Sequence, residues 1–179
     1  MSETNRSVLV AGAQGVIGQA AAEHFSAVPG TVVYGLSRRT IEGLPRVVPV
    51  TVDLLSPADV ERAIAPLSDV THIIFGAYIE RDTPGERSEV NVAMLRNLVT
   101  VVERSAPGLK HVTIYQGGKA YGADLGPFKT PAREDDPRLM SPNFYYAQED
   151  YLRTVRQARS GASASFALKR YADMRWETP

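Results

Sequence analysis

The chain has 179 residues, of which 44% are hydrophobic and 22% charged, with 20 basic residues against 20 acidic ones. This length suits one domain with a substantial core, and the balanced charge gives no reason to expect nucleic acid or an anionic membrane as a partner. Cysteine is absent, which excludes disulfides, thiolate metal sites and a thiol nucleophile. No apolar run approaches the roughly 18 residues of a membrane span, and no signal-peptide pattern precedes the first predicted strand, so a cytoplasmic protein is expected.

The first half of the chain alternates short apolar runs with amphipathic stretches, which is typical of a parallel sheet covered by helices. Strands are expected at 7–12, 31–36, 47–52, 70–75 and 109–115, the third of them distorted at Pro49. Helices are expected at 16–28, from Pro57 behind the N-cap Ser56, at 86–105 and at 143–160. This order predicts a doubly wound α/β fold of the Rossmann type.

The alternation stops after the fifth predicted strand. Residues 116–141 are rich in glycine and proline and show no clear periodicity. A loop of this length inside a compact domain is usually a functional lid or disordered. A final strand is expected at 165–169, and 170–179 is assigned to no element.

The segment between the first predicted strand and helix carries glycines spaced as G-x-x-G-x-x-G, at Gly12, Gly15 and Gly18. Gly12 permits the sharp turn, Gly15 the close approach of a pyrophosphate to the backbone, and Gly18 tight packing of the helix on the sheet. Phosphates then lie at the helix N-terminus, where unpaired N–H groups favour negative charge. We interpret this loop as a dinucleotide site. The alternative is a turn that merely needs glycines. The expected contacts from this loop are Gly12, Gln14, Gly15, Val16 and Ile17.

The end of the second predicted strand distinguishes between the two nicotinamide dinucleotides. An NAD site places Asp or Glu there to bind the ribose 2′-hydroxyl, whereas this strand runs into Ser37, Arg38 and Arg39. Guanidinium groups suit a 2′-phosphate, which a carboxylate would repel. We therefore favour NADPH as the cofactor, against the alternative that the two arginines are merely solvated on the surface. Further cofactor contacts are expected after the third strand, at Asp53 and Leu54, and after the fourth, at Ala77 and Tyr78.

Common short-chain dehydrogenases carry Tyr and Lys four residues apart on one helix, so that the ammonium lowers the pKa of the tyrosine. That spacing occurs here between Tyr115 and Lys119, but it straddles a strand end and two glycines, and we interpret it as coincidence. On the last predicted helix, Tyr145 is followed four residues later by Glu149. The usual helical pair is therefore missing.

With these motifs in view, the sequence resembles the progesterone 5β-reductase and iridoid synthase-like branch of the extended short-chain dehydrogenases/reductases. The resemblance runs from the glycine loop to about Leu152. The motifs that carry it are QGGK at 116–119, GPF at 126–128, EDDPR at 134–138, and NFYY with ED within 143–150. It implies reduction of the activated C=C bonds of small enones with NADPH, with Lys119 and Tyr145 as catalytic residues and Gln116 at the cofactor.

The mechanism implied by the resemblance is hydride transfer from NADPH to the β-carbon of an enone. Tyr145 donates a hydrogen bond to the oxygen on which negative charge develops, and Lys119 supplies positive potential. Ala120 departs from the family, which commonly has histidine there. Family members are also much longer, with a substrate-binding domain that has no counterpart here. Residues 1–160 are thus expected to form an NADPH-binding domain, and 161–179 an aberrant or truncated tail.

Other functions stay open at this stage. One is an NAD(P)-binding module without catalysis; another is a nucleotide-sugar epimerase- or dehydratase-like protein, against which the missing helical Tyr-x-x-x-Lys argues. A metal site is not expected, because His24, His72 and His111 lie far apart in the sequence, and His72 is interpreted as a core strand residue. Because at most one poor strand follows the fifth, we expect exposed apolar surface on the late strands and around 143–150, self-association into a homo-oligomer, and negligible turnover.

Overall fold

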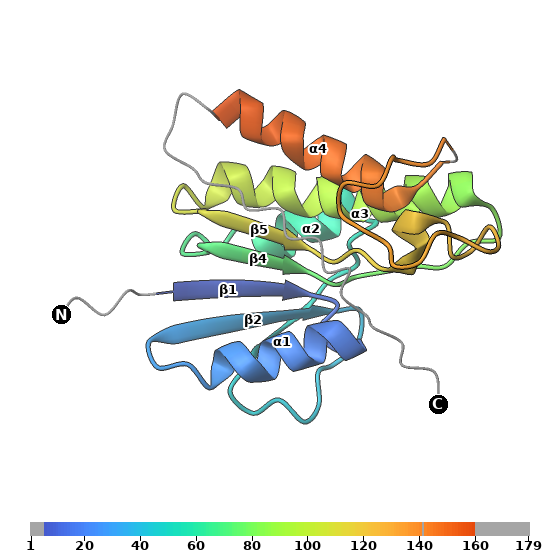
Figure 1. Ribbon diagram of the computed structural model, residues 1–179. Coiled ribbons are helices and arrows are strands. Elements are labelled where there is room, and N and C mark those ends of the chain that lie inside the picture. The colour runs from blue at the N-terminus through green and yellow to red at the C-terminus, as the bar shows by residue number, and fades with distance from the viewer. Residues whose placement is uncertain (1–5, 141, 160–179) are drawn as a thin grey trace.

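The computed structural model describes residues 6–140 and 142–159, which form a five-stranded parallel sheet with helices on both faces (Figure 1). The strands are β1 (Arg6–Ala11), β2 (Thr31–Ser37), β3 (Val48–Thr51), β4 (His72–Phe75) and β5 (His111–Ile114). The helices are α1 (Val16–Ser26), α2 (Pro57–Ile64), α3 (Pro84–Ser105) and α4 (Phe144–Arg159), with a short 3₁₀ helix η1 (Gly118–Tyr121). The strand order β3-β2-β1-β4-β5 confirms the predicted doubly wound α/β fold.

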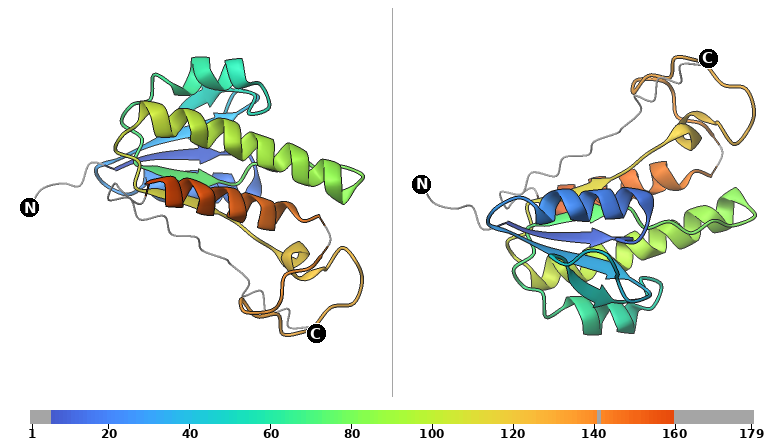
Figure 2. Two further views of the ribbon diagram at one scale, coloured as in Figure 1. Left: turned by 90° about the horizontal axis from the view of Figure 1, so that it is seen from above. Right: turned by 90° about the horizontal axis from the view of Figure 1, so that it is seen from below.

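Each face of the sheet has its own core. On one face, Leu9 of β1 packs with side chains of α2, α3 and α4. On the other, Val8 and Val10 pack with the small residues of α1 (Figure 2). All three of these valine and leucine side chains are fully buried, as expected for a central strand covered on both faces.

Two details of the elements differ from the sequence-based expectation. The pairing of β2 with β3 continues through Pro49, which lies opposite Gly35 with no inserted residue, so the predicted distortion is wrong. The physical reason is that β3 is an edge strand, where a residue without an N–H donor is tolerated. Helix α3 begins at Pro84, earlier than predicted, because the Thr83 hydroxyl accepts a hydrogen bond from the N–H of Glu86.

The irregular segment after β5 extends beyond the carboxyl ends of the strands (Figure 2). Its first part is attached to the beginning of α4, since the side chain of Asn143 donates to the carbonyl of Lys119 at 2.7 Å and the Tyr146 hydroxyl donates to the carbonyl of Ala120. The strand predicted at 165–169 and the tail 161–179 lie outside the described residues.

Helix α4 lies along α3 and covers the late strands (Figures 1 and 2). Phe144 and Leu152 are buried, with exposed fractions of 5% and 1%. The expected exposure of apolar surface around 143–150 is therefore wrong, because the start of α4 turns its apolar side chains toward α3 and the sheet. None of the helices within 6–140 and 142–159 is long and apolar enough to cross a membrane.

Candidate functional site

A cavity of about 570 Å³ opens at the carboxyl ends of β1, β2 and β4, where the strand order reverses. Five segments that are far apart in the sequence form its wall. Its lining residues are Gly12, Gln14, Gly15, Val16, Ile17, Leu36, Ser37, Arg38, Arg39, Val52, Asp53, Leu54, Gly76, Ala77, Tyr78, Ile79 and Met94. The structure thus brings together every predicted cofactor contact except Gln116.

The glycine loop forms one wall of the cavity. Gly12 has a φ of +78°, and a Cβ there would lie 2.9 Å from the backbone nitrogen of Ala77. A Cβ at Gly18 would lie 2.1 Å from the carbonyl oxygen of Gly12. At Gly15, in contrast, the same oxygen is 3.3 Å from an added Cβ, and the residue is exposed. Two of the glycines are therefore required by the chain's own packing, whereas Gly15 borders open space.

The first turn of α1 presents apolar side chains to the same space. Val16 has an exposed fraction of 91% and Ile17 of 43%, although both stand at the start of a helix that packs on the sheet. The backbone N–H groups of this turn are the ones that a helix leaves unpaired. A ligand seated here would meet N–H donors and an apolar edge together.

The segment after β2 is held against the glycine loop by side-chain hydrogen bonds. The Ser37 hydroxyl donates to Gln14 Oε1 at 2.9 Å, and Gln14 Nε2 donates to the carbonyl of Thr40 at 2.6 Å. Arg38 and Arg39 follow, both exposed at the cavity. Within 6–140 and 142–159 neither guanidinium pairs with a carboxylate, so this end of the cavity is positively charged.

Gln116, the remaining predicted cofactor contact, is not among the residues that line the cavity. It is buried between the end of β5 and α4, where its Nε2 donates to the carbonyl of Tyr145 at 3.3 Å and to Glu149 Oε2 at 3.5 Å. Glu149 is itself buried, and it pairs with Arg153 at 2.6 Å and Arg138 at 3.2 Å. The glutamate in place of the usual helical lysine therefore belongs to a polar cluster that joins α4 to the preceding loop.

Lys119 and Tyr145 lie near the far end of the cavity but are not hydrogen-bonded to each other in the described part of the chain. The Lys119 ammonium donates to the Tyr78 hydroxyl at 2.9 Å and to Glu80 at 2.8 Å. The Tyr145 hydroxyl accepts the N–H of Gly117, and burial raises the pKa of this half-buried phenol.

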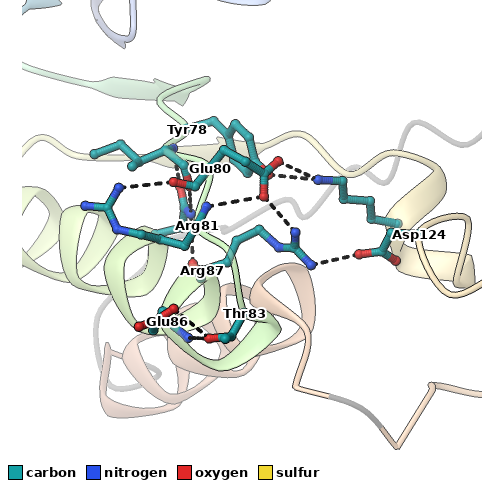
Figure 3. A network of polar contacts seen from close by, with 10 residues as sticks. Tyr78, Glu80, Arg81, Thr83, Glu86, Arg87 and Asp124 are labelled. Atoms are coloured by element: carbon teal, nitrogen blue, oxygen red, sulfur yellow. Dashed lines mark hydrogen bonds and ion pairs between the residues drawn. The ribbon is translucent and has the colours of Figure 1, made fainter.

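Lys119 pairs with Glu80 and so belongs to a charged network that sequence reasoning missed. Figure 3 shows Glu80, Arg87 and Asp124 of this network. Glu80 lies at its centre, and Arg87 donates to Glu80 at 2.6 Å and to Asp124 at 2.8 Å. The Arg87 guanidinium and then Lys119 hold the pKa of Glu80 well below its usual range. Burial lowers the pKa of Lys119, but its hydrogen bonds to Glu80 and Tyr78 outweigh this effect and leave the pKa raised. No spacing of residues in the sequence predicts this network, because its members come from three separate segments.

Comparison with known proteins identifies the family of this chain. Residues 48–163 match the family model of the PRISE-like Rossmann-fold domain. The chain belongs to this family. It is 37% identical over 172 residues to an (S)-8-oxocitronellyl enol synthase of Nepeta cataria and 36% identical over 159 residues to a 3-oxo-Delta(4,5)-steroid 5-beta-reductase of Arabidopsis thaliana. The predicted resemblance is confirmed.

The matches are unequal in extent. They cover 88% and 80% of this chain but 44% and 40% of the two relatives, so this PRISE-like chain spans less than half of their length. Among solved structures, a UDP-glucose 4-epimerase aligns over 93% of this chain with a TM-score of 0.73 at 16% identity. An NADPH-bound carbonyl reductase from chicken fatty liver aligns over 91% with a TM-score of 0.68 at 16% identity. These likenesses establish the Rossmann-type fold.

Proposed function

We propose that the chain binds NADPH in the cavity described above and that it is the cofactor-binding part of a reductase acting on the C=C bonds of enones. The observation that carries the proposal is the composition of the cavity wall. Unpaired helix N–H groups and exposed Gly15 suit a pyrophosphate, and the arginines after β2 suit a further phosphate. The substrate class rests on the enol synthase and steroid reductase relatives.

The preference for NADPH over NADH rests on Arg38 and Arg39. Both line the cavity with no carboxylate partner in the described chain, and a 2′-phosphate there would gain charge-assisted hydrogen bonds. Such a contact contributes about 1.5–3 kcal/mol, which corresponds to roughly tenfold or more in affinity. A carboxylate, which would repel that phosphate, is absent from residues 37–40.

Calorimetric titration with NADPH and NADH tests the cofactor assignment. We expect NADPH to bind at least about tenfold more tightly, and the double variant Arg38→Ala, Arg39→Ala to lose this preference. Arg46→Ala is the matched control, since Arg46 is exposed on the following loop and does not line the cavity. Equal dissociation constants for the two dinucleotides would contradict the assignment.

In the proposed reaction, bound NADPH supplies hydride to the β-carbon of the enone. The Gly117 N–H occupies a lone pair of the Tyr145 oxygen and leaves the phenol proton available for the carbonyl oxygen of the substrate. The raised pKa of Tyr145 keeps that proton in place at neutral pH. The Lys119 ammonium adds positive potential on the same side as the developing negative charge.

An NAD(P)-binding module without turnover is the second candidate. It is favoured by one observation, namely that neither Lys119 nor Tyr145 lines the cavity in the described residues. NADPH oxidation followed at 340 nm against a panel of enones, run beside calorimetry, separates the two. Binding with oxidation that Tyr145→Phe abolishes supports the reductase, and binding without oxidation supports the module.

A further inference from the structure

Tyr78 occupies a position at the site that the reaction above does not use. It follows β4, lines the cavity, and has an exposed fraction of 43%, so that a ligand in the cavity can reach it. Its ring packs against Phe144, the residue before Tyr145, with 5.3 Å between ring centroids. This contact fixes the position of the ring.

The Tyr78 hydroxyl is the phenol on which Lys119 acts. Lys119 Nζ donates to it at 2.9 Å, and the hydroxyl in turn donates to Glu80 (Figure 3). The ammonium also lies 5.3 Å from the centroid of the Tyr78 ring. Tyr145 has neither of these contacts in the described residues, and it does not line the cavity.

The groups around Tyr78 hold it as a proton-bearing donor. Burial and the hydrogen bond to Glu80 raise the pKa of Tyr78, and this outweighs the opposing effect of Lys119. Glu80 is exposed and is held by Arg87 as well, so the Tyr78 hydroxyl can turn from Glu80 to another acceptor without leaving Glu80 unpaired. Lys119 can keep donating to the phenol oxygen during that exchange.

We propose that Tyr78 is a second hydroxyl of the site, which exchanges Glu80 for the carbonyl oxygen of a bound enone and donates a hydrogen bond to it. Glu80 and Lys119 are positioning residues for this hydroxyl. The proposal rests on the proposed dinucleotide site, and it adds a donor from the β4 side to that of Tyr145 on α4. Two donors that converge on one oxygen stabilise developing negative charge better than one.

The pairing of Lys119 with Tyr78 is tested by carbon-13 NMR of tyrosine labelled at Cζ, with the Tyr78 and Tyr145 signals assigned from Tyr78→Phe and Tyr145→Phe. Among the 8 tyrosines, we expect Lys119→Met to raise the pKa of Tyr78 more than that of any other, because the ammonium that favours its phenolate is removed. A larger upward shift at Tyr145 would overturn the pairing, and so would an unshifted Tyr78.

The ligand contact is tested with 2-cyclohexen-1-one as probe, in the presence of NADP⁺ so that no reduction occurs. With NADP⁺ at a saturating concentration for each variant, we expect the probe to move the Tyr78 signal and Tyr78→Phe to weaken probe binding about tenfold, as loss of one hydrogen bond does. Tyr34→Phe is the matched control, because it removes a phenol bonded to a carboxylate, Asp69, outside the cavity.

The outcomes separate this inference from the proposed function. Dinucleotide binding with probe binding that Tyr78→Phe does not weaken overturns the role of Tyr78 and leaves the cofactor site standing. Dinucleotide binding without any probe binding does the same. A folded chain that binds neither NADPH nor NADP⁺ overturns both.

Discussion

The three glycines of the motif, Gly12, Gly15 and Gly18, look equivalent in the sequence. In the structure, the physical reason for glycine differs from one position to the next. Gly12 adopts a φ of +78°, which residues with a side chain rarely reach, and Gly18 packs directly on the Gly12 carbonyl. Gly15 has an ordinary φ of −82° as the N-cap of α1. The lack of a side chain at Gly15 therefore matters for a ligand in the cavity, which can approach the backbone closely there.

Gly15→Val is therefore expected to abolish NADPH binding in a protein that still folds. An added Cβ meets only the Gly12 oxygen, at 3.3 Å, so the backbone needs little adjustment, while the branched side chain fills the place of the pyrophosphate. Calorimetry and thermal unfolding check this together. Binding that survives in a folded variant would mean that the loop is only a turn.

Gly18→Ala is expected to have the opposite profile. Its Cβ would lie 2.1 Å from the Gly12 carbonyl oxygen and 2.6 Å from the carbonyl carbon, so α1 must move away from the sheet. Overpacking of this kind costs about 3 kcal/mol of unfolding free energy. Urea unfolding measures the loss, with Gly85→Ala as control, since an added Cβ at Gly85 meets no atom within 4 Å. Equal stability of the two variants would contradict the packing role.

At the scale of single elements, α3 owes its start to a reciprocal cap. The Thr83 hydroxyl accepts the Glu86 N–H at 3.2 Å and donates to the Glu86 carboxylate at 2.8 Å. The cap precedes the helix that spans the sheet from Pro84 to Ser105 and carries Arg87 into the network around Glu80. The N-terminal end of α3 is thus connected to the candidate site through Arg87.

Thr83→Ala is expected to lower the unfolding free energy by about 1 kcal/mol, the usual cost of losing such a cap. Urea unfolding checks the value. Thr83→Ser keeps the hydroxyl and should stay close to the wild-type protein. If the alanine variant were as stable as the serine variant, the cap would contribute nothing.

The neighbouring strands β4 and β5 place two histidines side by side that are far apart in the sequence. His72 and His111 are in register, with ring centroids 6.1 Å apart. His72 lies on β4 as expected but is half-buried and not in the core, and burial, helped by the charge of Arg6, lowers its pKa from 6.5 to about 4. Between these two values the unfolded chain takes up a proton that the folded chain does not.

Folding stability should therefore fall as the pH drops from about 6.5 to about 4, with no further contribution from His72 below that range. We expect His72→Gln to reduce this loss by about 1 kcal/mol, after allowance for solvent screening at a half-buried site. Urea unfolding at pH 7 and pH 4.5 measures it, with exposed His24→Gln as control. An unchanged acid-induced loss in His72→Gln would contradict the assignment.

At the scale of the whole molecule, exposed apolar side chains of the described residues lie in several places, Val32 and Val48 on β2 and β3 among them. Val16 and Ile17 border the cavity, and Leu125, Phe128 and Met140 lie on the loop between η1 and α4. Met140 is fully exposed, and Leu125 has an exposed fraction of 59%. Exposed apolar groups of this kind are commonly covered by association.

We therefore expect the chain to self-associate, through this loop and not through the late strands. The variant Leu125→Gln, Phe128→Gln, Met140→Gln should shift the mass measured by light scattering toward the monomer, while NADPH affinity stays the same. The control Val32→Gln changes an exposed apolar residue of β2 on another part of the surface. A wild-type chain that is already monomeric at high concentration would contradict the expectation.

Local features of the sequence were sufficient to predict the fold of this protein and the position of its cavity. The alternation of apolar and amphipathic runs predicted the parallel order, because buried strands and covering helices each have a short-range pattern. The glycine spacing and the residues that end β1 to β4 predicted the cavity wall, since the carboxyl ends of neighbouring parallel strands meet at one edge of the sheet.

Contacts between distant segments were decided only by the tertiary structure. Lys119 pairs with Tyr78 and Glu80, 41 and 39 residues away, and Gln116 turns to Glu149 under α4 instead of to the cavity. Neither outcome follows from spacing, because side-chain direction at a strand end depends on which helix packs over it. The sequence determined which groups reach the edge of the sheet, and the packing of α3, α4 and the intervening loop determined which of them meet.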